Sequence, residues 1–88
     1  MKFLSSREFK KSYRKLRRAE QERFKERIKI FGADPFDPML RNHALVGKYE
    51  GCRSIAVGGD MRVVYRVTEL GDVILLLDIG THSKLYKS

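Results

Sequence analysis

The 88-residue sequence has no tryptophan, one cysteine, two prolines and two histidines. A single cysteine excludes an internal disulfide and any zinc site built on several thiolates. The longest apolar run, residues 73–77, is far below the ~20 residues that a membrane-spanning helix needs. The first eight residues lack the apolar core of a secretion signal. These absences predict a single cytoplasmic domain that makes no contact with a membrane.

Positive charge is plentiful and is confined to one part of the chain. In total, 19 Lys and Arg oppose 11 Asp and Glu, a net charge of +8. Residues 1–31 hold twelve of the basic and four of the acidic residues, whereas residues 32–88 hold seven of each. Clustered positive charge is typical of proteins that bind nucleic acid or an acidic protein. The alternative is a solvated helical face that only keeps a small protein soluble.

The first third of the chain is predicted to be a short strand, residues 1–4, followed by helix over residues 6–31. In the capping-box tetrapeptide SSRE, the Ser5 hydroxyl is expected to accept a hydrogen bond from the Glu8 N–H. Apolar residues then recur at helical spacing. One straight helix would measure about 39 Å, whereas so short a domain is only about 30 Å across. We therefore expect a break near residues 17–20 and a helical hairpin.

The rest of the chain changes its pattern. Residues 32–50 contain both prolines and are predicted to be a loop. Residues 51–80 are predicted to hold three antiparallel strands joined by tight turns. The last of these strands, residues 73–79, is almost wholly apolar, which favours a central strand buried on both faces.

The predicted fold class is therefore α+β, in one domain that spans residues 1–88. An N-terminal strand and a basic helical hairpin pack on one face of a small, mostly antiparallel sheet. Residues 81–88 form a C-terminal tail beyond the last strand.

The residues with reactive side chains are few. They are the two histidines, His43 and His82, with Asp60 in a predicted turn and Arg62 and Arg66 on one face of the following strand. Such a set can cleave RNA without a metal. One group removes the proton of a 2′-hydroxyl, another protonates the departing 5′-oxygen, and cations stabilise the phosphate. Two histidines with scattered aspartates lack the spacing of a metal site, so no metal and no cofactor are expected.

Each of these residues also has a purely structural interpretation. Asp60 follows two glycines and suits a turn. Arg62 and Arg66 suit the solvated side of an edge strand. The structural alternative for Arg53 is an ion pair with a carboxylate instead of contact with a phosphate. For Lys84 the alternative is a charge that only increases the solubility of the protein.

Asp78 interrupts the apolar strand with the same parity as His82. It either orients that imidazole or is a sheet residue with its hydrogen bonds satisfied. Cys52 has no histidine at motif spacing and is interpreted as a buried strand residue.

Four segments carry a resemblance to a known family: NHALVG at 42–47, GCR at 51–53, DMRVVY at 60–65 and GTHSKLY at 80–86. With these segments the chain resembles the RelE/ParE superfamily of toxin–antitoxin toxins, and within it the YafQ-like branch of ribosome-dependent mRNA interferases. The C-terminal segment is the most specific, because it separates this branch from relatives that poison DNA gyrase. The basic first half matches only in its organisation.

The resemblance implies a metal-independent endoribonuclease. Matched residue by residue, His82 is the principal catalytic histidine and general acid. His43 and Asp60 correspond to the groups that activate or position the attacking 2′-hydroxyl. Tyr86 stands where the family has an aromatic residue that holds the substrate base. The basic residues expected to contact RNA are Arg53, Arg62, Arg66 and Lys84.

The expected partners are a cognate antitoxin that covers the basic surface, the ribosome with its mRNA, and operator DNA only through the antitoxin. One departure from the family stands out, because relatives commonly carry a further histidine at the position of Ala56. Two alternatives remain: a ParE-like inhibitor of DNA gyrase that cleaves no RNA, and a decayed toxin that only binds its antitoxin.

Overall fold

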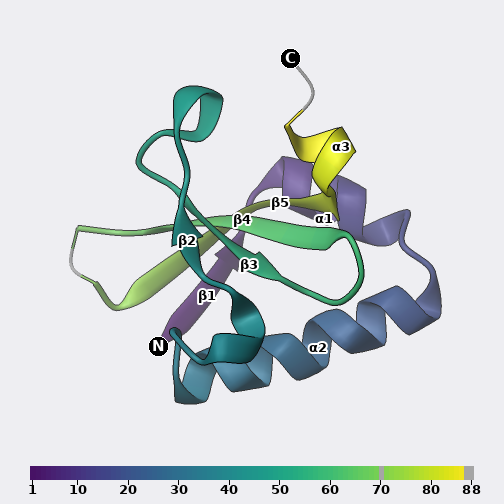
Figure 1. Cartoon of the computed structure of the whole chain (residues 1–88), viewed down its shortest axis with the longest axis horizontal. Coiled ribbons are helices and arrows are strands. Elements are labelled where there is room, and N and C mark those ends of the chain that lie inside the picture. Colours follow the sequence, from purple (N-terminus) through teal and green to yellow (C-terminus); the bar gives the residue numbers. More distant parts are fainter. Residues whose placement is uncertain (70, 87–88) are drawn as a thin grey trace.

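The computed structural model, which describes residues 1–69 and 71–86, contains one five-stranded sheet with helices against it (Figure 1). The strands lie in the order β1-β5-β4-β3-β2, and only β1 is parallel to its neighbour, β5. The predicted α+β class is confirmed. The strand bounds are β1 Lys2–Ser5, β2 His43–Ala44, β3 Arg53–Ala56, β4 Met61–Val67 and β5 Val73–Thr81.

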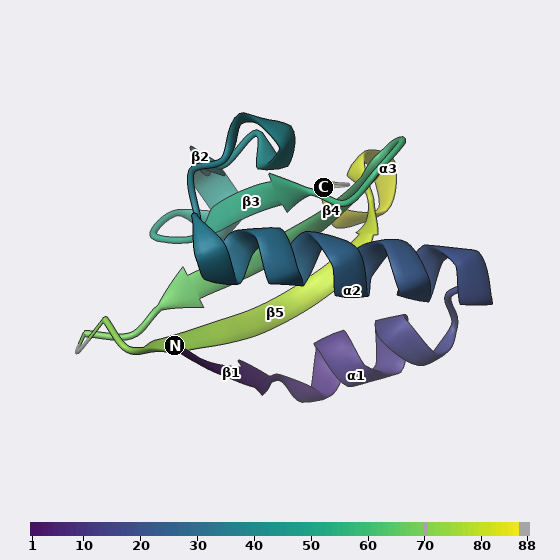
Figure 2. The same cartoon turned by 90° about the horizontal axis from the view of Figure 1, so that it is seen from below.

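The basic first half forms two helices, α1 (Arg7–Arg14) and α2 (Arg18–Ala33). The chain leaves the helical path at residues 15–17, slightly before the expected position. Helix α2 lies across one face of the sheet, and α1 continues the line of β1 beside β5 (Figure 2). The rings of Phe9 in α1 and Phe24 in α2 lie 5.5 Å apart, so aromatic packing closes the hairpin.

The start of α1 differs from the prediction. Ser6 is the N-terminal cap: its hydroxyl accepts from the Phe9 N–H at 3.0 Å and donates to the Leu77 carbonyl at 2.8 Å. The predicted cap at Ser5 is wrong by one residue. Ser5 is the last residue of β1 and pairs with Leu76, so the sheet already fixes its position.

The main core fills the space between the sheet and the two long helices. We call this side of the sheet the inner face. Its residues alternate along each strand with residues that point the other way. Phe31 and Tyr65 meet there edge to face, with ring centroids 5.1 Å apart. The buried members of this core are Phe9, Phe24, Phe31, Leu40, Ile55, Val57, Met61, Val63, Tyr65, Ile74, Leu76 and Ile79.

The opposite side of the sheet, here called the outer face, carries a smaller cluster. Val64 points to this side because it lies between two inner-face residues of β4. A short C-terminal helix, α3 (His82–Leu85), packs here through Leu85, which is 1% exposed. Partly buried side chains surround these two residues and the buried Cys52: Leu45, Tyr49, Leu77 and Tyr86.

The predicted loop over residues 32–50 is wrong in part. It contains two 3₁₀ turns, η1 (Pro38–Leu40) and η2 (Gly47–Tyr49), and the strand β2, in which His43 pairs with Ser54. A strand of two residues is too short to show an alternating pattern, which explains why the sequence does not reveal it.

Strand β5 lies between β1 and β4, but it is buried on one face only. Its inner-face residues are buried, whereas Val73, Leu75 and Leu77 remain partly exposed. The expectation of burial on both faces is therefore wrong, because no long helix covers the outer face. No helix in the described part of the chain is long and apolar enough to span a bilayer.

Candidate active site

Asp60 and His82 meet where the β3–β4 turn faces the junction of β5 and α3. Met61 pairs with Thr81 in the sheet, so the residues just outside that pair lie next to each other. The backbone N–H of His82 donates a hydrogen bond to the backbone carbonyl oxygen of Asp60 at 3.1 Å. Both residues are exposed. The fold therefore joins the backbones of Asp60 and His82, and both residues lie at one exposed corner of the molecule.

Aromatic packing fixes the position of His82. The Tyr86 ring lies 4.7 Å from the imidazole, and the Tyr49 ring lies 6.0 Å from that of Tyr86. Burial raises the pKa of Tyr49, and the negative charges of Asp78 and ionised Tyr86 add to the effect. The Tyr86 hydroxyl is buried and has no hydrogen-bond partner among the described residues. Tyr86 thus packs against the outer-face cluster while its ring remains in contact with the histidine.

His43 lies on the outer face of the sheet, some distance from Asp60 and His82. The register runs from His43 in β2 through Ser54 and Val64 to Asp78 in β5. Paired residues project to the same side of a sheet. Three spacings between strands lead across the sheet from His43 to Asp78, and four residues lead along the chain from Asp78 to His82. The Cα atoms of His43 and His82 are therefore roughly 15–20 Å apart. The His43 imidazole is exposed and its Nδ1 lies 2.9 Å from the Arg41 carbonyl oxygen.

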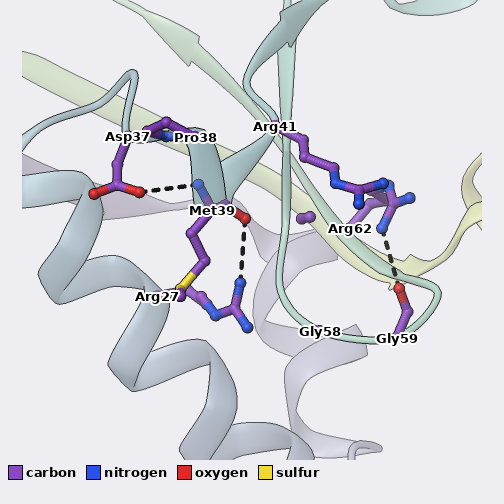
Figure 3. A pocket seen from close by; sticks show the side chains of 9 residues that line it. Arg27, Asp37, Pro38, Met39, Arg41, Gly58, Gly59 and Arg62 are labelled. Atoms are coloured by element: carbon purple, nitrogen blue, oxygen red, sulfur yellow. Dashed lines mark hydrogen bonds between the residues drawn. The ribbon is translucent and has the colours of Figure 1, made fainter.

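Arg62, two residues after Asp60, lines a pocket of about 700 Å³. Figure 3 shows its side chain in this pocket. Its guanidinium donates to the carbonyl oxygens of Met61 at 3.1 Å and Gly59 at 3.4 Å. Ala56, the position that the family resemblance associates with a histidine, lines the same pocket. Two further arginines, Arg27 and Arg41, complete its basic lining.

Arg53 does not join this group. Its Nε donates to the Asn42 side-chain oxygen at 2.8 Å, and its guanidinium lies 5.4 Å from the centre of the Phe36 ring. The Asn42 amide also donates to the Tyr65 hydroxyl at 2.6 Å. Arg53 therefore points to the inner side of the sheet with Tyr65, and its partner is an amide where a phosphate or carboxylate was expected.

Arg66 and Lys84 are also directed elsewhere. Arg66 shares the face of Arg62 but lies near the far end of β4, where it pairs with Leu75. The Lys84 ammonium donates to the Ser12 hydroxyl at 3.1 Å. Gly80 leaves room for this path, since a Cβ atom there would approach the Lys84 side chain to 3.0 Å. These two cations thus lie outside the corner formed by Asp60 and His82.

The contacts of Asp78 distinguish its two interpretations. Its carboxylate accepts from the Ser12 hydroxyl at 2.7 Å and from the Ile79 N–H at 2.8 Å. These contacts join α1 to the sheet. Asp78 is therefore a sheet residue whose carboxylate has hydrogen-bond partners of its own. The side chain that packs against the His82 imidazole is Tyr86.

Arg27 and Arg41 have no distinguishing signal in the sequence. Arg27 is one of many basic residues in α2, and Arg41 lies between η1 and β2, where no pattern marks it. Only the fold brings them to the pocket of Arg62. Within residues 1–69 and 71–86, no group of three or more His, Cys, Asp or Glu could hold a metal ion.

Comparison with known proteins places the chain in a family. Residues 1–87 match the family model described as "Bacterial toxin of type II toxin-antitoxin system, YafQ", so the chain belongs to the YafQ toxins. Among curated proteins there is no significant sequence match.

Solved structures show the same fold. YafQ from E. coli strain BL21(DE3) is 18% identical, with 96% of each chain covered and a TM-score of 0.79. A copper-bound mutant toxin from Helicobacter pylori is 25% identical, covering 98% of this chain and 99% of that one, with a TM-score of 0.72. YafQ in the E. coli DinJ–YafQ toxin–antitoxin complex is 19% identical, covering 96% and 94%, with a TM-score of 0.77.

Proposed function

We propose that this YafQ-family toxin is a metal-independent endoribonuclease that cleaves mRNA at the ribosome. The observation that carries the proposal is the main-chain hydrogen bond that joins Asp60 and His82 at one exposed corner, with Arg62 two residues beyond Asp60 along the chain. A carboxylate, an imidazole and a guanidinium are sufficient for RNA cleavage by the neighbouring 2′-hydroxyl.

In the proposed reaction, the Asp60 carboxylate takes the proton of the 2′-hydroxyl. The 2′-oxygen attacks the adjacent phosphorus, and the bond from phosphorus to the 5′-oxygen breaks. The His82 imidazolium gives its proton to that oxygen, leaving a 2′,3′-cyclic phosphate and a 5′-hydroxyl end. Arg62 stabilises the additional negative charge that develops on the phosphate oxygens.

The remaining residues hold the message. Tyr86 offers an aromatic ring next to the imidazole, on which an unpaired base can stack. Because His43 lies farther along the same face, we assign it to the RNA strand beyond the cleaved bond. A site with so few base contacts benefits from the ribosome, which holds the message in a fixed geometry. The basic, exposed surface of α1 and α2 is the proposed contact with ribosomal RNA.

We also propose a cognate antitoxin as the natural partner. YafQ of E. coli occurs in a toxin–antitoxin complex with DinJ. For the present chain, an acidic or amphipathic segment of the antitoxin would cover the basic surface and silence the toxin. Any contact with operator DNA is assigned to the antitoxin.

The experiment adds the purified protein to a translating extract and follows both message integrity and supercoiling by DNA gyrase. We expect cleavage of translated mRNA with unchanged supercoiling. Asp60→Asn should slow cleavage at least about 100-fold, because the general base is lost. Asp72→Asn, which changes an exposed aspartate in a different turn, is the matched control.

Two outcomes would contradict this function. Intact mRNA together with blocked supercoiling would identify a gyrase inhibitor of the ParE kind. Intact mRNA with normal supercoiling would identify a toxin that retains only antitoxin binding. If cleavage occurs but Asp60→Asn cleaves like Asp72→Asn, Asp60 is a turn residue and another group is the base.

A further inference from the structure

We infer that Arg27 and Arg41, which line one pocket together with Arg62, bind a phosphate group of the RNA strand next to the cleaved bond. The identity of the ligand as RNA rests on the proposed function. The pocket itself rests on the charge, the contacts and the position of these three side chains.

The positive charge of the pocket is not neutralised by ion pairs. The ion pairs among the described residues are Arg17–Glu20 and Lys25–Glu22, and neither involves a pocket arginine. The pocket has one carboxylate in its lining, Asp37, which accepts from the Met39 N–H at 2.9 Å and caps η1 (Figure 3). Uncompensated charge in a concave surface focuses the field and attracts an anion.

The three arginines come from three separate segments of the chain, and backbone carbonyl oxygens hold the side chains of Arg27 and Arg62. Arg27 comes from α2 and donates to the Met39 carbonyl at 3.3 Å. Arg62 comes from β4 and is held by carbonyls of the β3–β4 turn. Arg41 has a left-handed backbone, φ 49°, which sets the direction in which its side chain leaves the chain. Planar guanidinium groups that bond only to carbonyls keep further N–H donors for phosphate oxygens.

The location ties the pocket to the corner of Asp60 and His82. Gly58 and Gly59 line the pocket, and the next residue along the chain is Asp60. These glycines place no side chain between the pocket and the turn, and both have positive φ values, 100° and 55°. An RNA strand cleaved at Asp60 and His82 therefore has its neighbouring phosphate within reach of the arginines. The same proximity favours RNA over an acidic protein segment as the occupant.

The test measures binding separately from cleavage. A short single-stranded RNA with 2′-O-methyl sugars, which cannot be cleaved through the 2′-oxygen, is titrated with the full chain by fluorescence anisotropy at several salt concentrations. The variants are Arg27→Gln, which suits a helix, and Arg41→Asn, which tolerates a left-handed backbone. Lys2→Gln, on the exposed edge strand β1, is the control for loss of one charge.

Each pocket variant should weaken binding about tenfold, as expected for a charged hydrogen bond. It should also reduce the slope of log affinity against log salt by about 0.7, the contribution of one phosphate of a single strand. Lys2→Gln should weaken binding less than about twofold. If the pocket variants lose no more affinity than Lys2→Gln, the positive charge acts diffusely and the phosphate site does not exist.

The alternative occupant, an acidic protein segment, is tested by titrating the protein with an oligoglutamate peptide of similar charge to the RNA. If it binds more tightly than the RNA, and Arg27→Gln and Arg41→Asn abolish that binding, the pocket receives an acidic protein segment and the inference is wrong. Measuring mRNA cleavage beside RNA binding distinguishes a failure of this inference from a failure of the proposed function. Intact mRNA with pocket-dependent binding rejects the nuclease alone. Normal cleavage by variants that bind the analogue normally rejects the phosphate site alone.

Discussion

The two faces of the sheet differ in what they pack against. The inner face is covered by α1 and α2 and filled with large apolar side chains, with Phe31 between Phe3 and Tyr65 at centroid distances of 5.9 and 5.1 Å. The outer face has a small cluster, and the buried hydroxyl of Ser54 has no partner there among the described residues. The difference indicates that stability depends mainly on the inner face, while the outer face and its rim remain available for function.

The largest expected effect on stability comes from the inner face. Phe31→Ala should lower the free energy of unfolding by about 3–5 kcal/mol, because it leaves a cavity in a core without a cross-link. Urea denaturation provides the measurement. Phe36→Ala is the matched control: Phe36 is 64% exposed, and its removal should cost less than about 1 kcal/mol. Equal losses in the two variants would show that the inner face does not dominate stability.

On the outer face, truncation should cost less and affect function more. Leu85→Ala should lower the free energy of unfolding by about 2 kcal/mol, because Leu85 anchors α3 in a small cluster. Cleavage should fall with it, since α3 carries His82. Leu4→Ala, at a site 48% exposed, is the control for denaturation and cleavage. Full cleavage by folded Leu85→Ala would separate α3 packing from catalysis.

A smaller effect is expected where α1 joins β5. Ser12→Ala removes the hydroxyl that donates to Asp78 and accepts from Lys84, and should cost about 1 kcal/mol in urea denaturation. Ser83→Ala, at an exposed position in α3, should change stability by less than about 0.5 kcal/mol. If Ser12→Ala were as stable as Ser83→Ala, these contacts would have no role in holding α1.

The smallest effect should appear only at alkaline pH. Burial raises the pKa of Tyr65 above 10.0, partly offset by the Asn42 hydrogen bond and by Arg53. As the pH rises, the Tyr65 hydroxyl therefore loses its proton in the unfolded chain before it does so in the folded protein. The free energy of unfolding should fall as the pH rises above about 10. Tyr65→Phe should show a shallower loss between pH 10 and 12 in urea denaturation at stepped pH. Parallel curves would mean that Tyr65 does not titrate differently in the folded state.

Much of the fold follows from the sequence because its signals are local. The change from helical spacing to alternation near residue 51 and the turns GGD and ELGD indicate the α+β class. Two details were not accessible in this way. The N-terminal cap of α1 is Ser6 and not the predicted Ser5, because β1 extends through Ser5. Strand β2 is too short to give a periodic signal. Both depend on pairing with distant strands.

The residue types alone mark Asp60 and His82 as candidates, but only the family resemblance gives each of them a catalytic role. Asp60 and His82 lie side by side because the sheet register joins the turn to the end of β5. Their catalytic roles remain proposals. Arg53 carries the same charge as Arg62 but points to the inner face, a difference that follows from strand parity. Arg27 and Arg41 converge only through the path of the chain between α2 and β2.

The proposed role of the exposed corner is tested by His82→Ala, whose cleavage of translated mRNA is measured together with the thermal midpoint of the same sample. We expect at least about a 100-fold loss of cleavage, because the group that protonates the leaving oxygen is gone. We also expect a nearly unchanged midpoint, since His82 is exposed on the outer face. A variant that keeps its fold and cleaves at the wild-type rate would show that the reaction takes place elsewhere on the molecule.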